Sequence, residues 1–243
     1  MASFRSGRHI RSLPLQSNHQ SALLDLPASL RASLLRGGPP IRFSDLRQKQ
    51  FQQQQRTLLV FLIDASESMG EGALERMKAA KGALLGLLAG AYQNRDQVAM
   101  IAFRDRQAQV LLRPTDSVQL ARQQLRSLSL GGSTPFASGL HQAWQLIRVE
   151  RQKQPYLQPL LVIVSDGEAN LPLVPGADVF AELHELAKKI ARERIDSLVI
   201  DSCGGIGSSR LQQLALALAG HYRQIRELHA GKLIEAVRAA EQV

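Results

Sequence analysis

Cysteine, acidic residues and long apolar runs are all scarce in this sequence of 243 residues. The single cysteine, Cys203, excludes an internal disulfide framework and is typical of a reducing compartment, so we expect a cytoplasmic protein. No apolar stretch approaches the roughly 20 residues that a membrane-spanning helix needs, and the best candidate, residues 83–91, is too short. Neither a disulfide-stabilised extracellular domain nor a membrane-spanning protein is therefore expected.

The signature motifs of several enzyme classes are also missing. The sequence contains no H-E-x-x-H, no G-x-S-x-G, no cysteine pair at metal-binding spacing and no phosphate-binding G-x-x-x-x-G-K-[ST] loop. The histidines are scattered, and His141 and His184 fall within expected helices, where a surface or core role is more common than catalysis. Cys203 follows an expected strand with no histidine close by, so we expect an inert thiol. The chain alone is not expected to be catalytic.

Positive charge is concentrated in the first 56 residues. This segment holds nine of the 30 Lys and Arg residues but only two acids, Asp25 and Asp45, whereas the remainder is nearly neutral. Such a segment could contact nucleic acid or an acidic protein surface, or it could simply be a solvated basic arm. Because aromatic side chains are not interleaved with the charges, as a stacking platform for single strands would need, nucleic acid is not the expected partner.

The sequence divides into an N-terminal segment and a larger domain. Residues 1–56 are interpreted as a basic N-terminal arm that ends in a glutamine-rich connector, and residues 57–243 as one α/β domain. Within the arm, residues 1–24 superficially resemble an organelle transit peptide, because they contain Arg and Ser but no acid. Leucines at helical spacing predict a helix over residues 21–35, with Pro27 at its start or at a break.

The larger domain is organised around residues 58–70, which read LLVFLIDASESMG. Residues 58–63 form a continuous apolar run with β-branched and aromatic members, which predicts a strand buried on both faces of a sheet. Asp64, Ser66 and Ser68 follow at the carboxyl end of this strand, where open α/β sheets place their ligand sites. One carboxylate and two hydroxyls suit a hard divalent cation such as Mg²⁺ or Mn²⁺ rather than zinc. The alternative is an ordinary Asp/Ser turn after a strand.

Beyond this stretch the sequence alternates expected strands with expected helices and shows no internal repeat. Such alternation predicts a doubly wound, Rossmann-like α/β fold, in which helices cover both faces of a mostly parallel sheet. The expected strands are residues 98–103, 110–112, 160–164, 197–201 and 222–225, and the expected helices are residues 71–92, 117–128, 136–150, 179–194, 211–218 and 232–240.

Two further segments add oxygen ligands. Residues 131–135 form a Gly-Gly-Ser-Thr-Pro turn before a helix and offer the hydroxyl of Thr134. Asp166 follows the apolar strand 160–164 in the sequence Ser-Asp-Gly. If the two apolar strands are parallel neighbours, about 4.8 Å apart, Asp64 and Asp166 emerge at the same edge of the sheet and can share one ion.

At these residues the sequence resembles a known family. Its members carry a metal-ion-dependent adhesion site (MIDAS), and the family is that of the von Willebrand factor A domain. Five residues match the ligand positions of that site in order: Asp64, Ser66, Ser68, Thr134 and Asp166. The closer resemblance is to the C-terminal A domain of the magnesium chelatase D subunit, whose motifs are similar to residues 63–69, 77–83, 92–103, 131–140 and 165–170. Two stretches before the domain, residues 7–13 and 41–51, also resemble that subunit.

The resemblance implies that these five residues hold Mg²⁺ or Mn²⁺ and that a partner protein supplies an acidic ligand to the ion. Three residues beside the ligand positions, Glu67, Ser133 and Glu168, are assigned to partner binding. Glu67 stands where the family usually has glycine, and Glu168 where a basic residue is expected. If they point to the metal edge, their negative charge strengthens cation binding and disfavours an acidic partner ligand; if they point to water, they change little.

The implied function is that of a protein-interaction subunit acting beside an AAA+ ATPase in a chelatase-like complex. The ATPase-like domain of the family's D subunit has no counterpart in this sequence, so the chain resembles a free-standing A-domain protein. Involvement of a porphyrin and formation of a homo-oligomer are left open. One alternative is an adaptor of another AAA+ ATPase without tetrapyrrole chemistry, and a less favoured one is a metal-dependent hydrolase using Asp64 and Asp166. On a neighbouring subunit, Asp25 of the sequence Leu-Asp-Leu-Pro could complete the metal shell.

Overall fold

The chain folds as two units, residues 1–55 and residues 56–243, and each is described by itself. In this computed structural model, the residues described are 2–3, 8–15, 23–52, 56–66, 71–91, 96–104, 106–124, 133–202, 207–225 and 227–240. Within these ranges, no helix combines the length and the apolar character needed to cross a bilayer.

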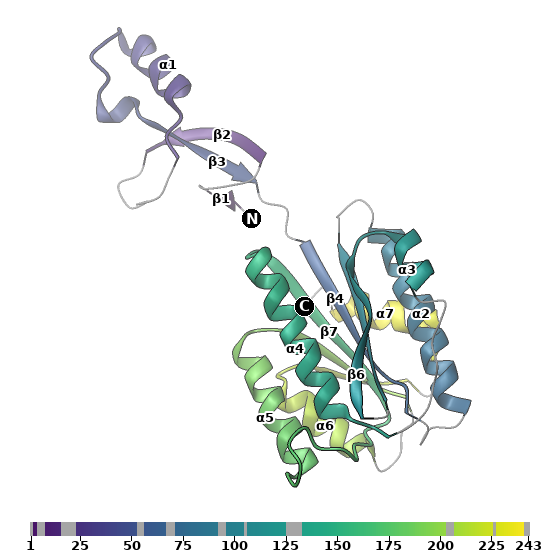
Figure 1. The fold of residues 1–243 in the computed structure, drawn as a ribbon. Coiled ribbons are helices and arrows are strands. Elements are labelled where there is room, and N and C mark those ends of the chain that lie inside the picture. The colour runs from purple at the N-terminus through teal and green to yellow at the C-terminus, as the bar shows by residue number, and fades with distance from the viewer. Residues whose placement is uncertain are drawn as a thin grey trace. The chain divides into compact units, whose positions relative to one another are not determined.

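Six strands of the larger unit form one sheet (Figure 1). Their order across the sheet is β6-β5-β4-β7-β8-β9, and every neighbouring pair is parallel except β5 and β6, which form an antiparallel hairpin. The strands are β4 (Arg56–Asp64), β5 (Gln97–Arg104), β6 (Gln107–Thr115), β7 (Leu157–Ser165), β8 (Asp196–Asp201) and β9 (His221–Gln224).

Helices cover both faces of this sheet, as Figure 1 shows. One face is covered by α4 (Phe136–Lys153), α5 (Val179–Arg192) and α6 (Gly207–Ala217). The other is covered by α2 (Glu71–Ala91), α3 (Val118–Gln124) and α7 (Ala230–Ala240). The chain therefore has the doubly wound α/β fold that the alternating pattern predicts.

The central strand β4 sends alternate side chains into two separate cores. Leu58, Val60 and Leu62 pack with α4, α5 and α6, whereas Leu59 and its odd-numbered neighbours pack with α2 and α7. Full burial of each such side chain stabilises the fold by about 1.5–3 kcal/mol. Because side chains alternate along a strand, the last residue of β4, Asp64, belongs to the face covered by α4.

Helix α4 packs directly against the sheet at a glycine. A Cβ atom on Gly139 would come within 2.8 Å of the Phe103 ring and 3.0 Å of Leu62. The Phe103 ring stacks on Phe136 with 4.9 Å between ring centroids, at the first residue of α4. This packing fixes the start of α4, and with it Thr134, against the carboxyl end of the sheet.

Most element boundaries agree with those expected from the sequence to within a few residues. Helix α6 begins at Gly207 rather than residue 211, because its first turn is polar and carries no apolar periodicity. Strand β6 spans nine residues instead of the expected three, 110–112. Most of its residues are exposed or half-buried, so they form no apolar run from which the full strand could be predicted. Of the expected helix 117–128, residues 118–124 form α3, and residues 125–130 lie outside the described residues, as do residues 131 and 132 of the expected turn.

The smaller unit contains an antiparallel sheet and one helix. Strands β1 (Ala2–Ser3), β3 (Arg47–Gln52) and β2 (Arg8–Pro14) lie in the order β1-β3-β2. Helix α1 (Leu26–Arg36) and the short 3-10 helix η1 (Phe43–Asp45) complete the unit. The interpretation of residues 1–56 as a basic arm is therefore not supported, since the described part is regular structure.

The glutamine-rich segment is the clearest departure from the expected organisation. Residues 47–52 form the middle strand of the small sheet instead of a solvated connector. Gln48 is almost fully buried, and neither polar atom of its side chain has a hydrogen-bond partner among the described residues. The two buried residues of this strand, Gln48 and Gln50, are both polar, so the sequence carries no alternating apolar signal and hydropathy does not predict the strand.

Asp25 has a structural role at the beginning of α1. It is the N-cap of the helix, its Oδ1 accepts from Ala28 N at 3.1 Å and its Oδ2 accepts from Ser12 Oγ. Pro27 lies in the first turn, where its missing N–H costs nothing. With 6% of its surface exposed, Asp25 is poorly placed to reach a metal ion on another subunit, so the structure argues against that role.

A second buried acid ties α1 to η1. Arg36 forms an ion pair with Asp45, with 2.8 Å between Nη2 and Oδ2, and Asp45 also accepts from Arg42 N at 2.8 Å. The hydrogen bond from Arg36, helped by that of Arg42, lowers the pKa of Asp45 to about 2. Both acids of this unit are thus internally paired.

Candidate metal site at the carboxyl edge of the sheet

Asp64 occupies the carboxyl end of β4 and is fully buried. Its Oδ1 accepts hydrogen bonds from Ser66 N at 3.1 Å and from Ser66 Oγ at 2.7 Å. Its Oδ2 accepts from Ser165 Oγ at 3.0 Å. These bonds hold both carboxylate oxygens in one orientation at the edge of the sheet.

Ser66 is also fully buried, and it follows the strand at the position expected for a ligand. Its hydroxyl donates a hydrogen bond to Asp64, and a hydroxyl oxygen can also act as a ligand of a hard cation. Glu67 and Ser68, expected respectively beside and within the ligand set, lie outside the described residues.

The neighbouring strand β7 brings Asp166 to the same edge. β4 and β7 are parallel, with Ile63 opposite Val164, so Asp64 and Asp166 leave the sheet on the same side. Asp166 is 8% exposed, and its Oδ1 accepts from Glu168 N at 3.0 Å, which closes a turn. The side chain of Glu168 is exposed to solvent. The strand adjacency assumed from the sequence is therefore confirmed.

Thr134 is joined to the loop that follows Asp166. Its N–H donates to Asn170 Oδ1 at 2.7 Å, and its carbonyl accepts from Asn170 N at 3.3 Å. Ser133, expected to bind a partner, lies immediately before it and is half-buried. The start of α4 is thus fastened to the β7 loop, while Ser165 fastens β7 to Asp64.

The hydroxyl of Thr134 provides a test of whether these residues fit a metal ion. Thr134 is fully buried, and its Oγ1 has no hydrogen-bond partner in the described part of the chain. Such an orphaned oxygen costs free energy unless something binds it. A divalent ion bound between this hydroxyl and the two aspartates would remove that cost, so the residues fit the ion.

The donor set suits a hard cation. Four described residues, Asp64, Ser66, Thr134 and Asp166, supply only carboxylate and hydroxyl oxygens, the ligands that Mg²⁺ and Mn²⁺ prefer. Among the described residues, no group of three His, Cys, Asp or Glu side chains is placed to hold a metal. The hydrolase alternative gains no support from such a cluster.

Three polar residues at this edge were not singled out from the sequence. Ser165 and Asn170 lie within a matched motif, yet only the structure shows that they hold Asp64 and Thr134. Asp201 ends β8 and gives the same sequence signal as Asp64, a carboxylate after a buried strand. Both aspartates end a buried strand, and part of what distinguishes their surroundings lies far away in sequence: Ser165 bonds Asp64, whereas Tyr222 and Gln224 bond Asp201.

Asp201 is surrounded by donors from its own neighbourhood. Its Oδ2 accepts from Tyr222 OH at 2.8 Å and Gln224 Nε2 at 3.3 Å, and also from Ser208 Oγ. Burial, with a smaller contribution from the bond to Asp201, raises the pKa of Tyr222. This carboxylate is fully buried and serves to join β8, β9 and α6.

The two histidines expected within helices make contacts on their own helices. His184 Nδ1 lies 2.8 Å from the carbonyl oxygen of Phe180 on its own helix, and the His141 ring packs 5.9 Å from that of Trp144. Cys203 lies outside the described residues.

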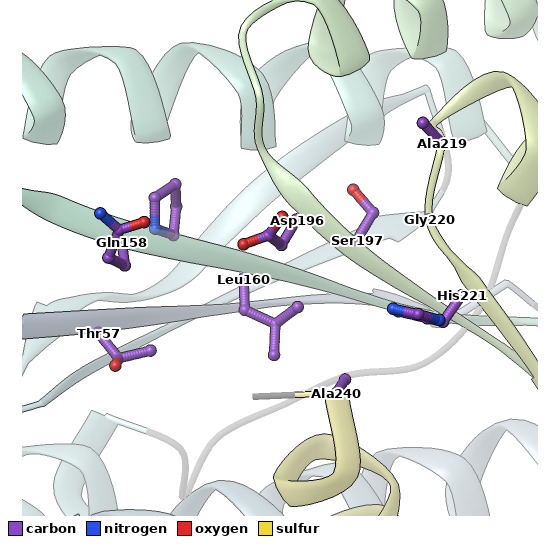
Figure 2. Close-up of a pocket in the computed structure, with 10 residues that line it drawn as sticks. Thr57, Gln158, Leu160, Asp196, Ser197, Ala219, Gly220, His221 and Ala240 are labelled. Atoms are coloured by element: carbon purple, nitrogen blue, oxygen red, sulfur yellow. The ribbon is translucent and has the colours of Figure 1, made fainter. Parts of the chain in front are cut away.

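A hollow of about 300 Å³ lies at the opposite edge of the sheet, where β4 begins (Figure 2). Thr57, Gln158, Asp196, His221 and Ala240 are among its lining residues. Asp196 and His221, both exposed, are the titratable side chains among the described residues that line it. One carboxylate and one imidazole are too few donors for a rival metal site.

Comparison with known proteins identifies the family and the fold. The profile of the von Willebrand factor type A domain matches residues 59–168. The magnesium-chelatase 67 kDa subunit of Chlorobaculum parvum is 37% identical over 211 residues, which cover 82% of this chain and 33% of that subunit. The chain thus spans about a third of the length of this relative.

Two other similar proteins are informative. The protein MJ0910 of Methanocaldococcus jannaschii is 33% identical over 176 residues, which cover 70% of this chain and 98% of that protein. The manganese-loaded TRAP protein of Plasmodium vivax aligns in structure with a TM-score of 0.56 and 17% identity, covering 77% of this chain and 73% of that chain. At this identity the structural likeness concerns the fold alone.

Proposed function

Because the chain belongs to the von Willebrand factor type A domain family, we propose that it is a protein-interaction subunit whose binding depends on a divalent metal ion. The observation that carries this proposal is the buried Thr134 hydroxyl without a hydrogen-bond partner among the described residues, at the start of a helix fastened to the loop after Asp166. Asp64, Ser66, Thr134 and Asp166 would hold the ion, together with Ser68.

The coordination number of the ion explains how such a site would recognise a partner. Mg²⁺ takes six oxygen ligands, and the five residues proposed here leave one position for an oxygen from outside the chain. A bound ion would be a Lewis acid at that position and would attract an anionic oxygen. Mg²⁺ commonly keeps an open or water-filled position in protein sites. An Asp or Glu side chain of the partner is therefore the expected last ligand.

Several residues near the ligands would serve the same interaction without touching the ion. Ser165 keeps Asp64 in place, and Asn170 holds the backbone of Thr134. Glu168 is exposed, and its charge would tune the approach of an acidic partner. Glu67 and Ser133 are proposed to lie along the same contact surface.

The partner that we propose is a separate AAA+ ATPase subunit, and the complex is chelatase-like. This proposal is supported by the similarity to the magnesium-chelatase 67 kDa subunit over most of the chain. The magnesium inserted by such a complex would be its substrate and distinct from the ion at this site. A second candidate is an adaptor of another AAA+ ATPase without tetrapyrrole chemistry.

Metal binding is the first part of the proposal to test. Calorimetric titration of Mg²⁺ and Mn²⁺ into the purified chain is expected to show one saturable site. Asp64→Asn keeps the shape of the side chain but removes its charge, so binding should fall at least about tenfold. Asp116→Asn, at an exposed aspartate after β6, is the matched control and should bind as the wild type does. Equal binding by the two variants would place the metal elsewhere.

Partner binding is tested separately. The purified AAA+ subunit of a magnesium chelatase is immobilised, and the chain is applied with millimolar Mg²⁺ or with a chelator. Retention that requires both Mg²⁺ and Asp64 would support the chelatase-like complex. Metal binding without retention would favour the adaptor of another ATPase, because the site would be intact and the partner wrong.

A further inference from the structure

The leucines of α1 lie on the outside of the small unit. Leu26, Leu30 and Leu34 follow one another at intervals of four residues and are 65%, 52% and 67% exposed. Side chains at this spacing are neighbours on a helix surface. They form a continuous ridge, called here the leucine stripe. A helix in a folded unit normally turns such a stripe toward its core.

The helix uses a polar face to pack on its own unit. Ser29 and Ser33 are 1% and 2% exposed. Ser29 Oγ donates to the carbonyl of Asp25 at 2.7 Å and accepts from Arg47 N at 2.8 Å, and Ser33 Oγ lies 3.2 Å from the carbonyl of Gly38. Because hydrogen bonds attach this face, the leucine stripe is not needed for the packing of α1.

The charge around the leucine stripe has one sign. Residues 1–55 contain only two acids, Asp25 and Asp45, and both are buried and paired. The same unit holds eight Lys and Arg residues, of which Arg11, Arg31, Arg36 and Arg42 are exposed. The surface of this unit therefore offers exposed leucines and cations without any exposed acid. Large exposed apolar surfaces bordered by polar residues mark interaction sites.

We propose that the leucine stripe binds an acidic amphipathic helix of a partner protein. A ridge at four-residue spacing fits the groove of another helix, as in the commonest class of helix packing. Glu or Asp residues beside the partner's apolar stripe would then face Arg31 and the other cations of this unit. This surface belongs to the unit before the A domain and needs no metal.

Two other occupants fit less well. A second copy of the chain would bring two acid-free cationic surfaces together, which ordinary Coulomb repulsion disfavours. An anionic membrane usually binds helices with several basic residues on one face. Besides Arg31, α1 carries only Arg36, which is paired with Asp45. The acidic helix is therefore the occupant that matches both the apolar ridge and the charge.

The test uses the full chain and designed peptides of about 20 residues, long enough to form a helix. One peptide carries Leu at helical spacing with Glu elsewhere, and its control has Lys in place of Glu. By fluorescence anisotropy, the Glu peptide is expected to bind at least about tenfold more tightly than the Lys peptide. The double variant Leu30→Ser/Leu34→Ser should bind the Glu peptide at least about tenfold more weakly.

Two control variants test whether the peptide binds at the leucine stripe rather than at any exposed leucine of the chain. Leu216→Ser removes an 80% exposed leucine of the other unit and should leave peptide binding unchanged. Arg31→Glu reverses the charge beside the leucine stripe and keeps all three leucines, so it should weaken binding of the Glu peptide and strengthen binding of the Lys peptide. Both results should persist when Mg²⁺ is chelated.

Several outcomes would overturn the proposal. Absence of Glu-peptide binding, or equal binding by the double variant, would exclude the leucine stripe as its site. A wild-type dimer that the double variant abolishes in sedimentation velocity would make a second copy the occupant. Co-sedimentation with phosphatidylserine vesicles, without peptide binding, would make it a membrane.

Discussion

The Thr134 hydroxyl should lower the stability of the metal-free protein and raise its affinity for a metal ion. One substitution, Thr134→Val, tests both effects. The buried hydroxyl of Thr134 has no partner among the described residues, which costs about 1–3 kcal/mol. Thr134→Val keeps the shape and the backbone bonds to Asn170. Without metal, we expect the variant to be about 1 kcal/mol more stable by urea unfolding, because it has no orphaned hydroxyl.

The same variant should lose metal affinity. If Thr134 is a ligand, Mn²⁺ should bind to Thr134→Val at least about tenfold more weakly by calorimetry. Thr57→Val, at the other end of the sheet, is the control and should bind Mn²⁺ normally. Unchanged Mn²⁺ affinity in Thr134→Val would remove Thr134 from the ligand set.

Asp201 is predicted to be structural, although it resembles Asp64 in sequence. Ser208, Tyr222 and Gln224 all donate to its carboxylate, and these bonds join three elements. Asp201→Asn should lower the free energy of unfolding by about 1–3 kcal/mol, because bonds to a charged acceptor are lost. Calorimetry should show Mn²⁺ binding within about twofold of the wild type, whereas a large loss would make Asp201 part of the site.

At the scale of elements, the approach of α4 to the sheet depends on Gly139. Alanine normally stabilises a helix relative to glycine by about 1 kcal/mol. Here a Cβ would meet the Phe103 ring at 2.8 Å, so Gly139→Ala should instead destabilise the larger unit by about 1–3 kcal/mol in urea unfolding. It should also weaken metal binding, because α4 carries Thr134 on its N-terminal side.

A second glycine provides the comparison. A Cβ on Gly86 would meet only the end of the flexible Ile234 side chain, at 2.7 Å. Gly86→Ala should therefore be close to neutral. If both variants were equally stable, close packing at Gly139 would not govern the position of α4.

The central strands of the larger unit could be predicted from the sequence because they are apolar. β4 and β7 are continuous apolar runs between helical patterns, so their existence and their parallel pairing in a covered sheet follow from physical rules. Their adjacency, which brings Asp64 and Asp166 together, does not follow from either segment alone. It was implied by the resemblance to the A-domain family.

The small unit could not be predicted in the same way. β3 is glutamine-rich, and its pairing with β2 joins residues about 40 positions apart without an apolar pattern. The leucines of α1 gave the expected helical spacing, but their spacing cannot tell an inward stripe from an outward one. The hydrogen bonds of Ser29 and Ser33 turn the opposite face of α1 toward the unit, and these bonds are seen only in the folded structure.

At the scale of the molecule, acid should destabilise the small unit through its two buried aspartates. The folded-state pKa of Asp45 is about 2, below its ordinary value near 4, so its ionised form stabilises the small unit. This contribution is complete above about pH 4 and is lost as the pH falls toward about 2. The pKa of Asp25 is also lowered, chiefly by the hydrogen bond from Ser12, and acts in the same direction.

The single tryptophan allows the two units to be followed separately. Trp144 lies in α4, so its fluorescence reports only the larger unit, whereas circular dichroism reports both. Between about pH 4 and pH 2, urea should unfold the small unit progressively earlier, as a dichroism change without a fluorescence change. Asp45→Asn should flatten this pH dependence. Coincident transitions by both probes would show that the units unfold together.

Strand β4 links two kinds of contact in one chain. The larger unit begins at Arg56, the first residue of β4, directly after residues 1–55. Asp64 is the last residue of β4, and at the usual rise per residue it lies about 26 Å from Arg56. A partner assembly that offers an acidic helix to the leucine stripe and a carboxylate to the metal edge would be held bivalently. Once one contact forms, the second benefits from a high effective concentration, so two weak contacts can give a long-lived complex. Removing the metal would then shorten the residence time of the subunit without releasing it at once.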